Sequence, residues 1–360
     1  MHPDTPDRLR RMRGAAPAKR HNARTVAALT GNPGCARRAV LDAAGIDKDA
    51  LARRIGFPAK FGQSQFAITR GNTFEAQVKA NGYAELVRLM RETLDLEITE
   101  VGAKDLNEVG GNDSQELRHV GTRQALEAAV DGREPLTLLD HPLLRLDVGG
   151  NDVYLEPDLV AFHHDGVMHV VEIKSFAIID DRADAGKVAA AARQSAVYVL
   201  ALRRLLGDDK VSHEVVLVCP KDFSNRPTAV KIDVRKQLIT LDHQLSRLAR
   251  IDTLVDLLPD DLSLELDSHS PEQLLTALSE MEPRYAPACL ASCEMAYFCR
   301  DESAGCTSIL GTSDREELGS VETVARALDL ARGYAEPSVE ETEAAAMLQA
   351  TARIYATVAA

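Results

Sequence analysis

The chain has 360 residues, 45% of them hydrophobic, and a formal net charge of −13 at pH 7. This length fits one large or two modest domains, and the apolar content supports a sizeable core. The sequence has no apolar run long enough to span a membrane and no apolar signal core near its start. We therefore expect a cytoplasmic globular protein without a membrane partner.

Charge is distributed unevenly along the chain. Residues 1–38 contain nine Lys and Arg against two acids, whereas residues 251–360 contain 21 acids against six Arg. A basic arm and an acidic tail predict different partners, or a contact between the two. The overall acidity argues against tight non-specific binding to nucleic acid. A metal-dependent enzyme nevertheless binds phosphate partly through its metal ion, so a modest basic footprint can suffice.

The N-terminal region is rich in Arg and Pro over residues 1–23, which predicts a flexible basic arm. Two short helices are expected over Thr25–Leu29 and Arg37–Ala44, on either side of the break at Asn32-Pro33-Gly34. Cys35 follows that break, where a lone cysteine is ordinarily a small core residue.

Glu75 closes the stretch Arg70-Gly71-x-x-x-Glu75, directly before a helix predicted over Ala76–Leu94. A glutamate at a helix start is stabilised by the helix dipole, so Glu75 taken alone has a structural explanation. A second helix is predicted over Ser114–Val130, and the strands begin within Thr137–Leu146.

A β-hairpin is predicted from two alternating apolar runs, Val153–Phe162 and Val167–Lys174, around the turn His164-Asp165-Gly166. Asp158 lies on the first strand, and Glu172 lies near the end of the second. Mg²⁺ prefers hard oxygen ligands, so two carboxylates on adjacent strands can share one ion.

Lys174 lies two residues after Glu172, and alternate residues of a strand share a face. Lys174 is therefore expected beside the metal ion, where it orients or helps to deprotonate a water, or offsets charge on the phosphate. Ile173 is expected to point into the core. The alternative is a charged rim on an ordinary α/β sheet, which needs the same residues and has no catalytic function.

A helix predicted over Lys187–Leu206 carries Gln194 and Tyr198, which share one face because they are four residues apart. The continuous apolar run Glu214–Val218 predicts a buried strand. A further strand and a further helix are expected over Thr228–Asp233 and Arg235–Leu258.

Four of the six cysteines fall within 18 residues, in the pattern Cys289-x3-Cys293-x5-Cys299-x6-Cys306. In a chain without a secretion signal, this clustering favours a metal over disulfides. Thiolates suit Fe–S clusters or Zn²⁺, but zinc knuckles usually have two close cysteine pairs. Zn²⁺ and metal-free reduced cysteines are the alternatives to a cluster.

The motifs of the hairpin and the helix resemble the PD-(D/E)xK nuclease superfamily, here Pro157-Asp158 followed by Glu172-x-Lys174. Gln194-x-x-x-Tyr198 is similar to the Q-x-x-x-Y motif of the RecB-like branch. The resemblance implies that Gln194 and Tyr198 touch the nucleic acid beside the catalytic centre. Arg70-Gly71-x-x-x-Glu75 resembles the first motif of that branch. The metal ligands that the resemblance implies for Mg²⁺ or Mn²⁺ are Glu75, Asp158, Glu172 and the carbonyl of Ile173.

The cysteine spacing resembles the iron–sulfur RecB-like nucleases, which include the AddB type and a CRISPR-associated exonuclease family. These proteins have one cysteine before the nuclease core and three after it, commonly as C-x2-C-x5-C. The resemblance implies that Cys35, Cys289, Cys293 and Cys299 bind a [4Fe–4S] cluster. The spacing Cys289-x3-Cys293 is one residue longer than usual, so Cys306 is an alternate fourth ligand.

The fold class that follows is α/β, with a restriction-endonuclease-like mixed central sheet flanked by helices. Helical N-terminal and C-terminal regions would be joined by the metal cluster. The predicted segments are a flexible basic arm (1–23), a helical region with the first motif (24–135), a nuclease core (136–250), a cysteine-rich region (251–310) and a helical acidic tail (311–360). The tail helix is predicted to open at the capping box Ser338-x-x-Glu341.

The predicted function is metal-dependent hydrolysis of DNA, single-stranded or with ends, in repair or antiviral defence. The pattern G-x-x-x-x-G-K-[ST] of ATP-driven motors is absent, so a helicase or a defence-system subunit is an expected partner. One alternative is a catalytically silent subunit that binds nucleic acid or supports assembly. The other is a restriction-type endonuclease.

Overall fold

The computed structural model describes residues 4–29, 32, 34–58, 65–97, 101–107, 114–134, 137–149, 151–155, 159–164, 166–180, 182–222, 224–248 and 251–358. The chain forms two compact units. The first contains residues 1–19, 31–60 and 252–360, and the second contains residues 20–30 and 61–251. The N-terminal segments and the last hundred residues therefore fold together, although the whole second unit separates most of them in sequence.

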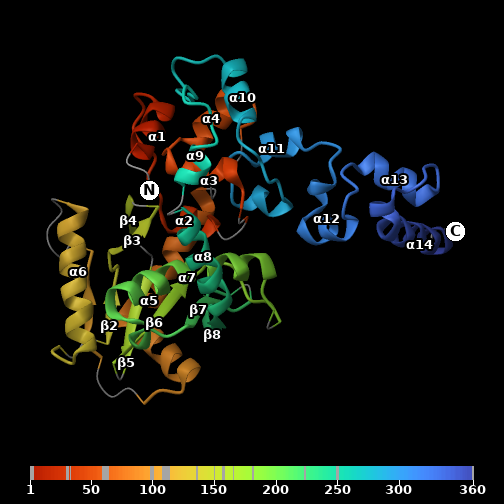
Figure 1. The fold of residues 1–360 in the computed structure, drawn as a ribbon. Helices are drawn as coiled ribbons and strands as arrows, with labels where there is room; N and C mark the ends of the chain where they lie inside the picture. Colours follow the sequence, from red (N-terminus) through yellow and green to blue (C-terminus); the bar gives the residue numbers. More distant parts are fainter. Residues whose placement is uncertain are drawn as a thin grey trace. The chain divides into compact units, whose positions relative to one another are not determined.

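The second unit is built on a mixed six-stranded sheet with the order β1-β2-β5-β6-β7-β8 (Figure 1). Neighbours run antiparallel except in the pairs β1–β2 and β6–β7, which are parallel. Strands β3 and β4 form a separate antiparallel pair. The strand bounds are β1 Ala103–Asp105, β2 Leu138–Asp140, β3 Leu144–Val148, β4 Asn151–Leu155, β5 Leu159–His164, β6 Val167–Ile173, β7 Glu214–Pro220 and β8 Pro227–Asp233.

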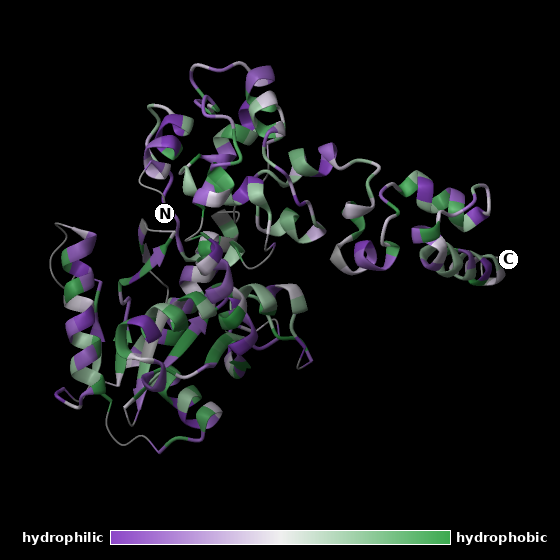
Figure 2. Cartoon of the chain, in the orientation of Figure 1, coloured by the Kyte–Doolittle hydropathy of each residue, from purple (hydrophilic) through white to green (hydrophobic). Residues whose placement is uncertain are grey.

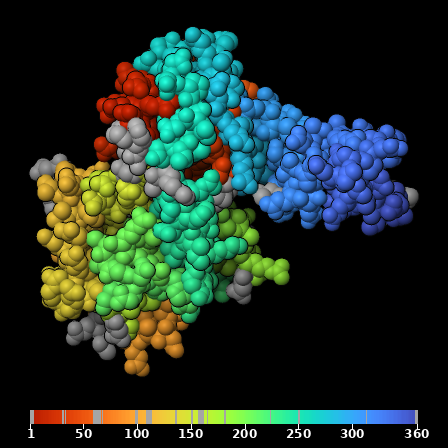
Figure 3. All heavy atoms as spheres, in the orientation of Figure 1, coloured from red at the N-terminus to blue at the C-terminus, as the bar shows by residue number. Residues whose placement is uncertain are grey.

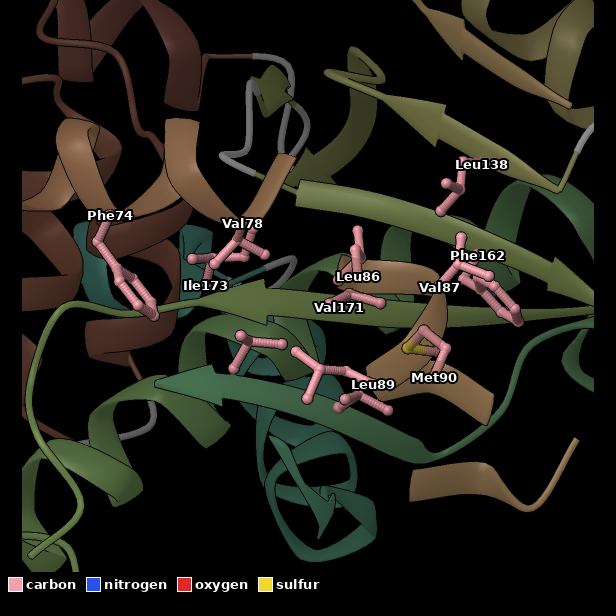
Figure 4. Close-up of a cluster of buried hydrophobic side chains, with 12 residues drawn as sticks. Phe74, Val78, Leu86, Val87, Leu89, Met90, Leu138, Phe162, Val171 and Ile173 are labelled. Carbon is pink, nitrogen blue, oxygen red and sulfur yellow. The ribbon is translucent and has the colours of Figure 1, made fainter. Parts of the chain in front are cut away.

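Helices cover both faces of this sheet. Helix α5 (Gln65–Leu94) packs on one face through a buried cluster that includes Phe74 and Val78 of the helix and Val171 and Ile173 of β6 (Figure 4). Helix α7 (Ala185–Leu206) lies against the other face, where its Ala191 packs with two residues of β7. Figure 2 shows hydrophobic residues along the sheet, and hydrophilic and hydrophobic residues mixed along α6. The other helices of this unit are α2 Ala23–Leu29, α6 Gln115–Val130, η1 Asp208–Lys210 and α8 Arg235–Leu248.

Helix α7 connects the parallel strands β6 and β7, as the sequence predicts for the helix after Lys174. Parallel neighbours need such a crossover because the chain must return to the same end of the sheet. The predicted α/β class, with a mixed sheet flanked by helices, is confirmed at this level.

Several boundaries differ from those expected. The strands begin within Thr137–Leu146 as expected, but this stretch contains two of them, β2 and β3, which belong to different sheets. The first strand of the hairpin begins at Leu159, because residues 151–155 form β4 beside β3 instead. The helix expected over Arg235–Leu258 ends at Leu248, and α9 (Asp252–Val255) follows it in the first unit. An apolar alternation does not reveal when the partner strand changes, so periodicity alone joins such segments.

Helix α5 is also longer than the expected Ala76–Leu94, since it begins at Gln65. The helix is interrupted at residues 80–83, where Asn81, Gly82 and Tyr83 have φ of 54°, 65° and 65°. Left-handed backbone is unfavourable for an aromatic residue such as Tyr83, so the surrounding contacts must stabilise this turn.

The first unit contains the short helices α1 Thr5–Arg13, α3 Ala36–Ala43, α4 Lys48–Arg54, α9, α10 Pro271–Ser279, η2 Pro287–Ala291 and α11 Ala296–Glu302. The flexible arm expected over residues 1–23 instead contains α1, whose Leu9 and Met12 are buried. Leu264 donates its backbone N–H to the Met12 carbonyl at 2.7 Å. Because the apolar partners of α1 come from residues far along the chain, the local sequence does not reveal them. Figure 3 shows atoms of the N-terminal helices beside atoms of residues near 250–300.

The last part of the first unit is helical. It contains η3 Thr307–Leu310, α12 Thr312–Leu318, α13 Val324–Arg332, η4 Val339–Glu341 and α14 Thr342–Val358. The predicted capping box is confirmed, because Ser338 and Glu341 satisfy each other's backbone groups before α14. Within the described parts of the chain, none of the helices is long and apolar enough to cross a membrane.

Candidate functional site

Glu172 and Lys174 lie at the carboxyl end of β6, in the centre of the sheet. Glu172 is 1% exposed. The Lys174 ammonium is 2.5 Å from a Glu172 carboxylate oxygen, and the Lys174 N–H donates to the Val218 carbonyl of β7 at 2.9 Å. Ile173 packs in the core on the α5 side. The predicted alternation of these three side chains is therefore confirmed.

Helix α7 brings two further polar groups to this strand end. Lys174 donates to the Gln194 side-chain oxygen at 3.2 Å, and the Gln194 amide donates to the Tyr198 hydroxyl at 2.9 Å. Tyr198 is 1% exposed. The four side chains form one continuous polar chain from strand to helix, which we call the Glu172–Tyr198 chain. This arrangement holds the Lys174 ammonium beside the buried Glu172 carboxylate. The Gln194 amide is next to the ammonium, and the Tyr198 hydroxyl follows it.

Asp158 lies outside the described residues, so its position relative to Glu172 stays a prediction. The residue after Asp158 is described: Leu159 of β5 lies opposite Glu172 of β6 in the register of the two strands.

Glu75 lies inside α5, ten residues after its start, and therefore not in a first helical turn. Glu75 was expected at a helix start, where the helix dipole would stabilise it. That expectation is wrong, so the helix dipole does not explain Glu75. Gly71, one turn earlier in α5, lies near the carboxyl end of β6. A Cβ atom at Gly71 would be 3.9 Å from the hydroxyl oxygen of Ser175, which follows that strand. Glu75 itself contacts Lys79, whose ammonium is 2.5 Å away.

Three residues that the sequence analysis did not single out complete a network around Glu75. Asp140, at the end of β2, is 2% exposed. Its carboxylate accepts from the Lys79 ammonium at 2.8 Å and from the Tyr83 hydroxyl at 2.9 Å. Asp140 pairs with Val160 of β5, so it lies at the same end of the sheet as Glu172. By strand alternation Asp140 faces α5, whereas Glu172 faces α7.

Burial and the Asp140 carboxylate together raise the pKa of Tyr83, so the hydroxyl stays protonated and donates. Burial opposes the charge of Lys79, but its hydrogen bonds with Asp140 and Glu75 outweigh that cost and raise its pKa. Lys79 is therefore a fixed cation between two carboxylates. The sequence contained one weak indication of this network, an acid directly after two leucines in Leu138-Leu139-Asp140, the residues that form β2.

The second candidate site is the group of cysteines in the first unit. Cys289, Cys293 and Cys299 are buried, and Cys35 is half-buried at the N-terminus of α3. The thiols of Cys293 and Cys35 both act electrostatically on Cys299, and those of Cys289 and Cys299 both act on Tyr285. These couplings place Cys35 and Cys293 in the electrostatic neighbourhood of Cys299, whereas their service as one ligand set stays a prediction.

Cys306 has a different setting. It forms an isolated antiparallel bridge with Thr323 and immediately precedes η3. Which cysteine would complete a four-ligand set remains a prediction.

Burial raises the pKa of Cys293 to about 11 and that of Cys299 to about 12. Both thiols are therefore protonated near neutral pH in the metal-free chain. Binding of a metal replaces those protons, because the thiolate is the ligand.

Cations surround the cysteines. Arg37, Arg38 and Lys48 are each at most 7% exposed. Arg38 and Lys48 both favour a negative Cys293, and Arg37 favours a negative Cys299. Acidic partners balance these cations, as Lys48 binds Asp42 and Glu294. The cations offset part of the effect of burial on the two thiols, but burial outweighs them and the pKa of both thiols is raised.

Among the described residues, no three His, Cys, Asp or Glu side chains form a group that could hold a metal ion. Thiol donors of this kind suit both Zn²⁺ and Fe–S clusters, so the group that the cysteines bind stays a prediction.

Comparison of the chain with family models, with curated proteins and with solved structures gave no match.

Proposed function

We propose that this protein is a metal-dependent nuclease that hydrolyses phosphodiester bonds of DNA, with a restriction-endonuclease-like core of the RecB-like PD-(D/E)xK type. The single observation that carries the proposal is the Glu172–Tyr198 chain. A structural charged rim has no need for a buried carboxylate, a lysine 2.5 Å from it and an amide–hydroxyl pair extending away from that lysine. Active sites commonly hold such paired charges out of water.

Each residue of the proposed site has a distinct role. Glu172, Asp158 and the Ile173 carbonyl would hold Mg²⁺ or Mn²⁺. Glu75, which pairs with Lys79 on the α5 side of the sheet, would join them by exchanging that partner for the ion. When bound, such an ion polarises a phosphoryl oxygen and acidifies a coordinated water. Lys174 would orient the attacking water and offset charge on the phosphate. Gln194 would position the nucleic-acid strand next to Lys174, and the buried Tyr198 hydroxyl would hold the Gln194 amide in place.

Cys35, Cys289, Cys293 and Cys299 would bind a [4Fe–4S] cluster, with Cys306 as the alternate ligand and Zn²⁺ as the alternative metal. The support is the electrostatic coupling of Cys35 and Cys293 to Cys299, beside the buried cations Arg37, Arg38 and Lys48. The role of the cluster would be structural: it would tie residues 32–38 to residues 282–302, which are already in contact through Arg37 and Glu282. A tie between segments this distant in sequence restricts the unfolded chain, so its binding energy contributes to folding.

Purified protein, prepared without oxygen, tests the nuclease proposal in the presence of Mn²⁺ on linear single-stranded DNA. The wild type is expected to degrade the DNA and Glu172→Gln to lose the activity. Glu214→Gln is the matched control, because Glu214 begins the neighbouring strand β7 at the opposite end of the sheet. Equal activity of Glu172→Gln and the wild type would contradict the proposal.

The same assay distinguishes the other functions. A wild type that binds DNA but does not cleave it would be a silent subunit, which could serve a helicase or a defence complex. Cleavage of circular duplex DNA at discrete positions would indicate a restriction-type endonuclease. Cleavage restricted to linear substrates would indicate an end-dependent exonuclease.

A further inference from the structure

Two side chains of the N-terminal segment donate hydrogen bonds to cysteine sulfurs. The Asn32 amide is 3.1 Å from Sγ of Cys289, and the Arg37 guanidinium is 3.4 Å from Sγ of Cys299. Asn32 is 8% exposed and Arg37 is 1% exposed. Both donors are thus shielded from water and directed at two different sulfurs.

The Arg37 side chain has several hydrogen-bond partners besides Cys299. It makes hydrogen bonds of 2.6 and 3.0 Å to the Glu302 carboxylate, and it donates to the carbonyls of Leu278 and Met281 at 2.9 and 3.2 Å. Its guanidinium carbon lies 5.2 Å from the Phe298 ring centre. A planar donor fork fixed in this way has a defined geometry toward Cys299 before any metal binds.

Burying a guanidinium is costly, and the cost is recovered only through good geometry and complete hydrogen bonding. The Glu302 carboxylate and two carbonyls account for most of the donors, and Cys299 takes a further one. Asn32 similarly divides its amide between the Arg284 carbonyl and Cys289. Packing alone does not require either side chain to face sulfur.

We propose that Arg37 and Asn32 are positioning residues that set the reduction potential of the [4Fe–4S] cluster through N–H···S hydrogen bonds. This inference rests on the cluster assigned under the proposed function. Hydrogen bonds to the sulfurs are one of the means by which a protein tunes such a potential. Reduction adds one electron and one negative charge to the cluster, and N–H donors stabilise that charge. Both residues therefore raise the potential and favour the reduced state.

The test is an anaerobic titration with dithionite, followed by electron paramagnetic resonance, on the full chain. Asn32→Leu removes a donor at nearly constant size, and Arg37→Lys keeps the charge but loses the planar fork. Both variants are expected to shift the midpoint potential to more negative values. Two controls are Arg300→Met, which removes an exposed arginine next to Cys299, and Asn107→Leu, which makes the same asparagine change in the second unit. Both controls are expected to keep the wild-type midpoint.

A second measurement needs no variant and covers the case in which Asn32→Leu or Arg37→Lys fails to fold. Wild-type protein is reconstituted with iron and sulfide in H₂O and in D₂O, and its Fe–S stretching bands are compared by resonance Raman spectroscopy. N–H···S bonds are expected to shift the bands of the cysteine-bound irons on deuteration. Bands that do not move, or variant midpoints equal to the wild type, would overturn the inference.

Iron and sulfide analysis of the wild type separates this inference from the proposal beneath it. A chain without iron overturns both the cluster and its tuning, whereas the nuclease assay above still decides the catalytic proposal. An iron-loaded chain with unshifted variants overturns the tuning alone.

Discussion

The Lys174 ammonium lies 2.5 Å from the Glu172 carboxylate, at the end of a central strand. Glu172 is almost fully buried, and a buried charge without a partner is costly. Lys174 therefore supplies a counter-charge inside the protein. A divalent ion at Glu172 would take over that role and leave Lys174 free to act on water or phosphate.

Replacing Lys174 by Met is expected to reduce nuclease activity by about 10²- to 10⁴-fold, the range that proton-transfer groups contribute. The measurement is the rate of DNA degradation at saturating Mn²⁺. Lys231→Met is the matched control, because Lys231 is an exposed lysine on β8 that pairs with Glu214. If both variants lose activity equally, Lys174 has no special role.

Tyr198→Phe removes the hydroxyl that accepts from the Gln194 amide. We expect a loss of about 1 kcal/mol in unfolding free energy, typical for one hydrogen bond. If Gln194 and Tyr198 position DNA, the change also raises KM more than it lowers kcat. Tyr154→Phe, at a tyrosine of β4 in the separate two-stranded sheet, should leave KM at the wild-type value.

Asp140→Asn is expected to destabilise the chain by about 1.5–3 kcal/mol, because Lys79 loses one of its two carboxylate partners and keeps Glu75. Urea unfolding followed by circular dichroism measures the change. Asp131→Asn is the control: it breaks an exposed pair with Arg133 and should stay within about 0.5 kcal/mol of the wild type. A loss no larger than that of the control would show that the Glu75–Lys79–Asp140 network contributes little to stability.

Cys299→Ser is expected to lose iron and to lower the melting temperature, since the cluster would join segments distant in sequence. Cys306→Ser should keep the iron content of the wild type, because Cys306 lies in a bridge with Thr323. Iron analysis and thermal melts of both variants provide the check. If iron is lost only in Cys306→Ser, then Cys306 is a ligand of the cluster and Cys299 is not.

The C-terminal helices should become less stable in acid. Hydrogen bonds from Arg326 and from the Ser338 backbone lower the pKa of Glu341 to about 2, from an ordinary value of 4.5. The folded state therefore binds the proton more weakly than the unfolded state. The stabilisation is complete above about pH 4.5 and is lost as pH falls toward 2. Thermal melts across this range should show a steeper decline for the wild type than for Glu341→Gln, whereas Glu340→Gln should follow the wild type.

The sequence alone determined the local features whose causes are local. Alternation along β6 placed Glu172 and Lys174 on one face and Ile173 in the core. The four-residue spacing of Gln194 and Tyr198 placed them on one helix face, where they are hydrogen-bonded. The capping box at Ser338 and Glu341 was also predictable, because its two residues are three positions apart at a helix start. In each case the geometry follows from the repeat of the strand or helix.

Only the tertiary structure decided the rest. It grouped Asp140 of a strand, Lys79 of a helix and Tyr83 of the interruption in that helix, and it packed α1 through Leu9 and Met12. It also directed Asn32 and Arg37 at sulfurs that lie 257 and 262 residues away in the chain. Periodicity reports the face of an element but not its neighbour, because the neighbour is selected by packing over the whole chain. The sequence could therefore predict the residues of the Glu172–Tyr198 chain, whereas the partners of Glu75 and of the cysteines required the fold.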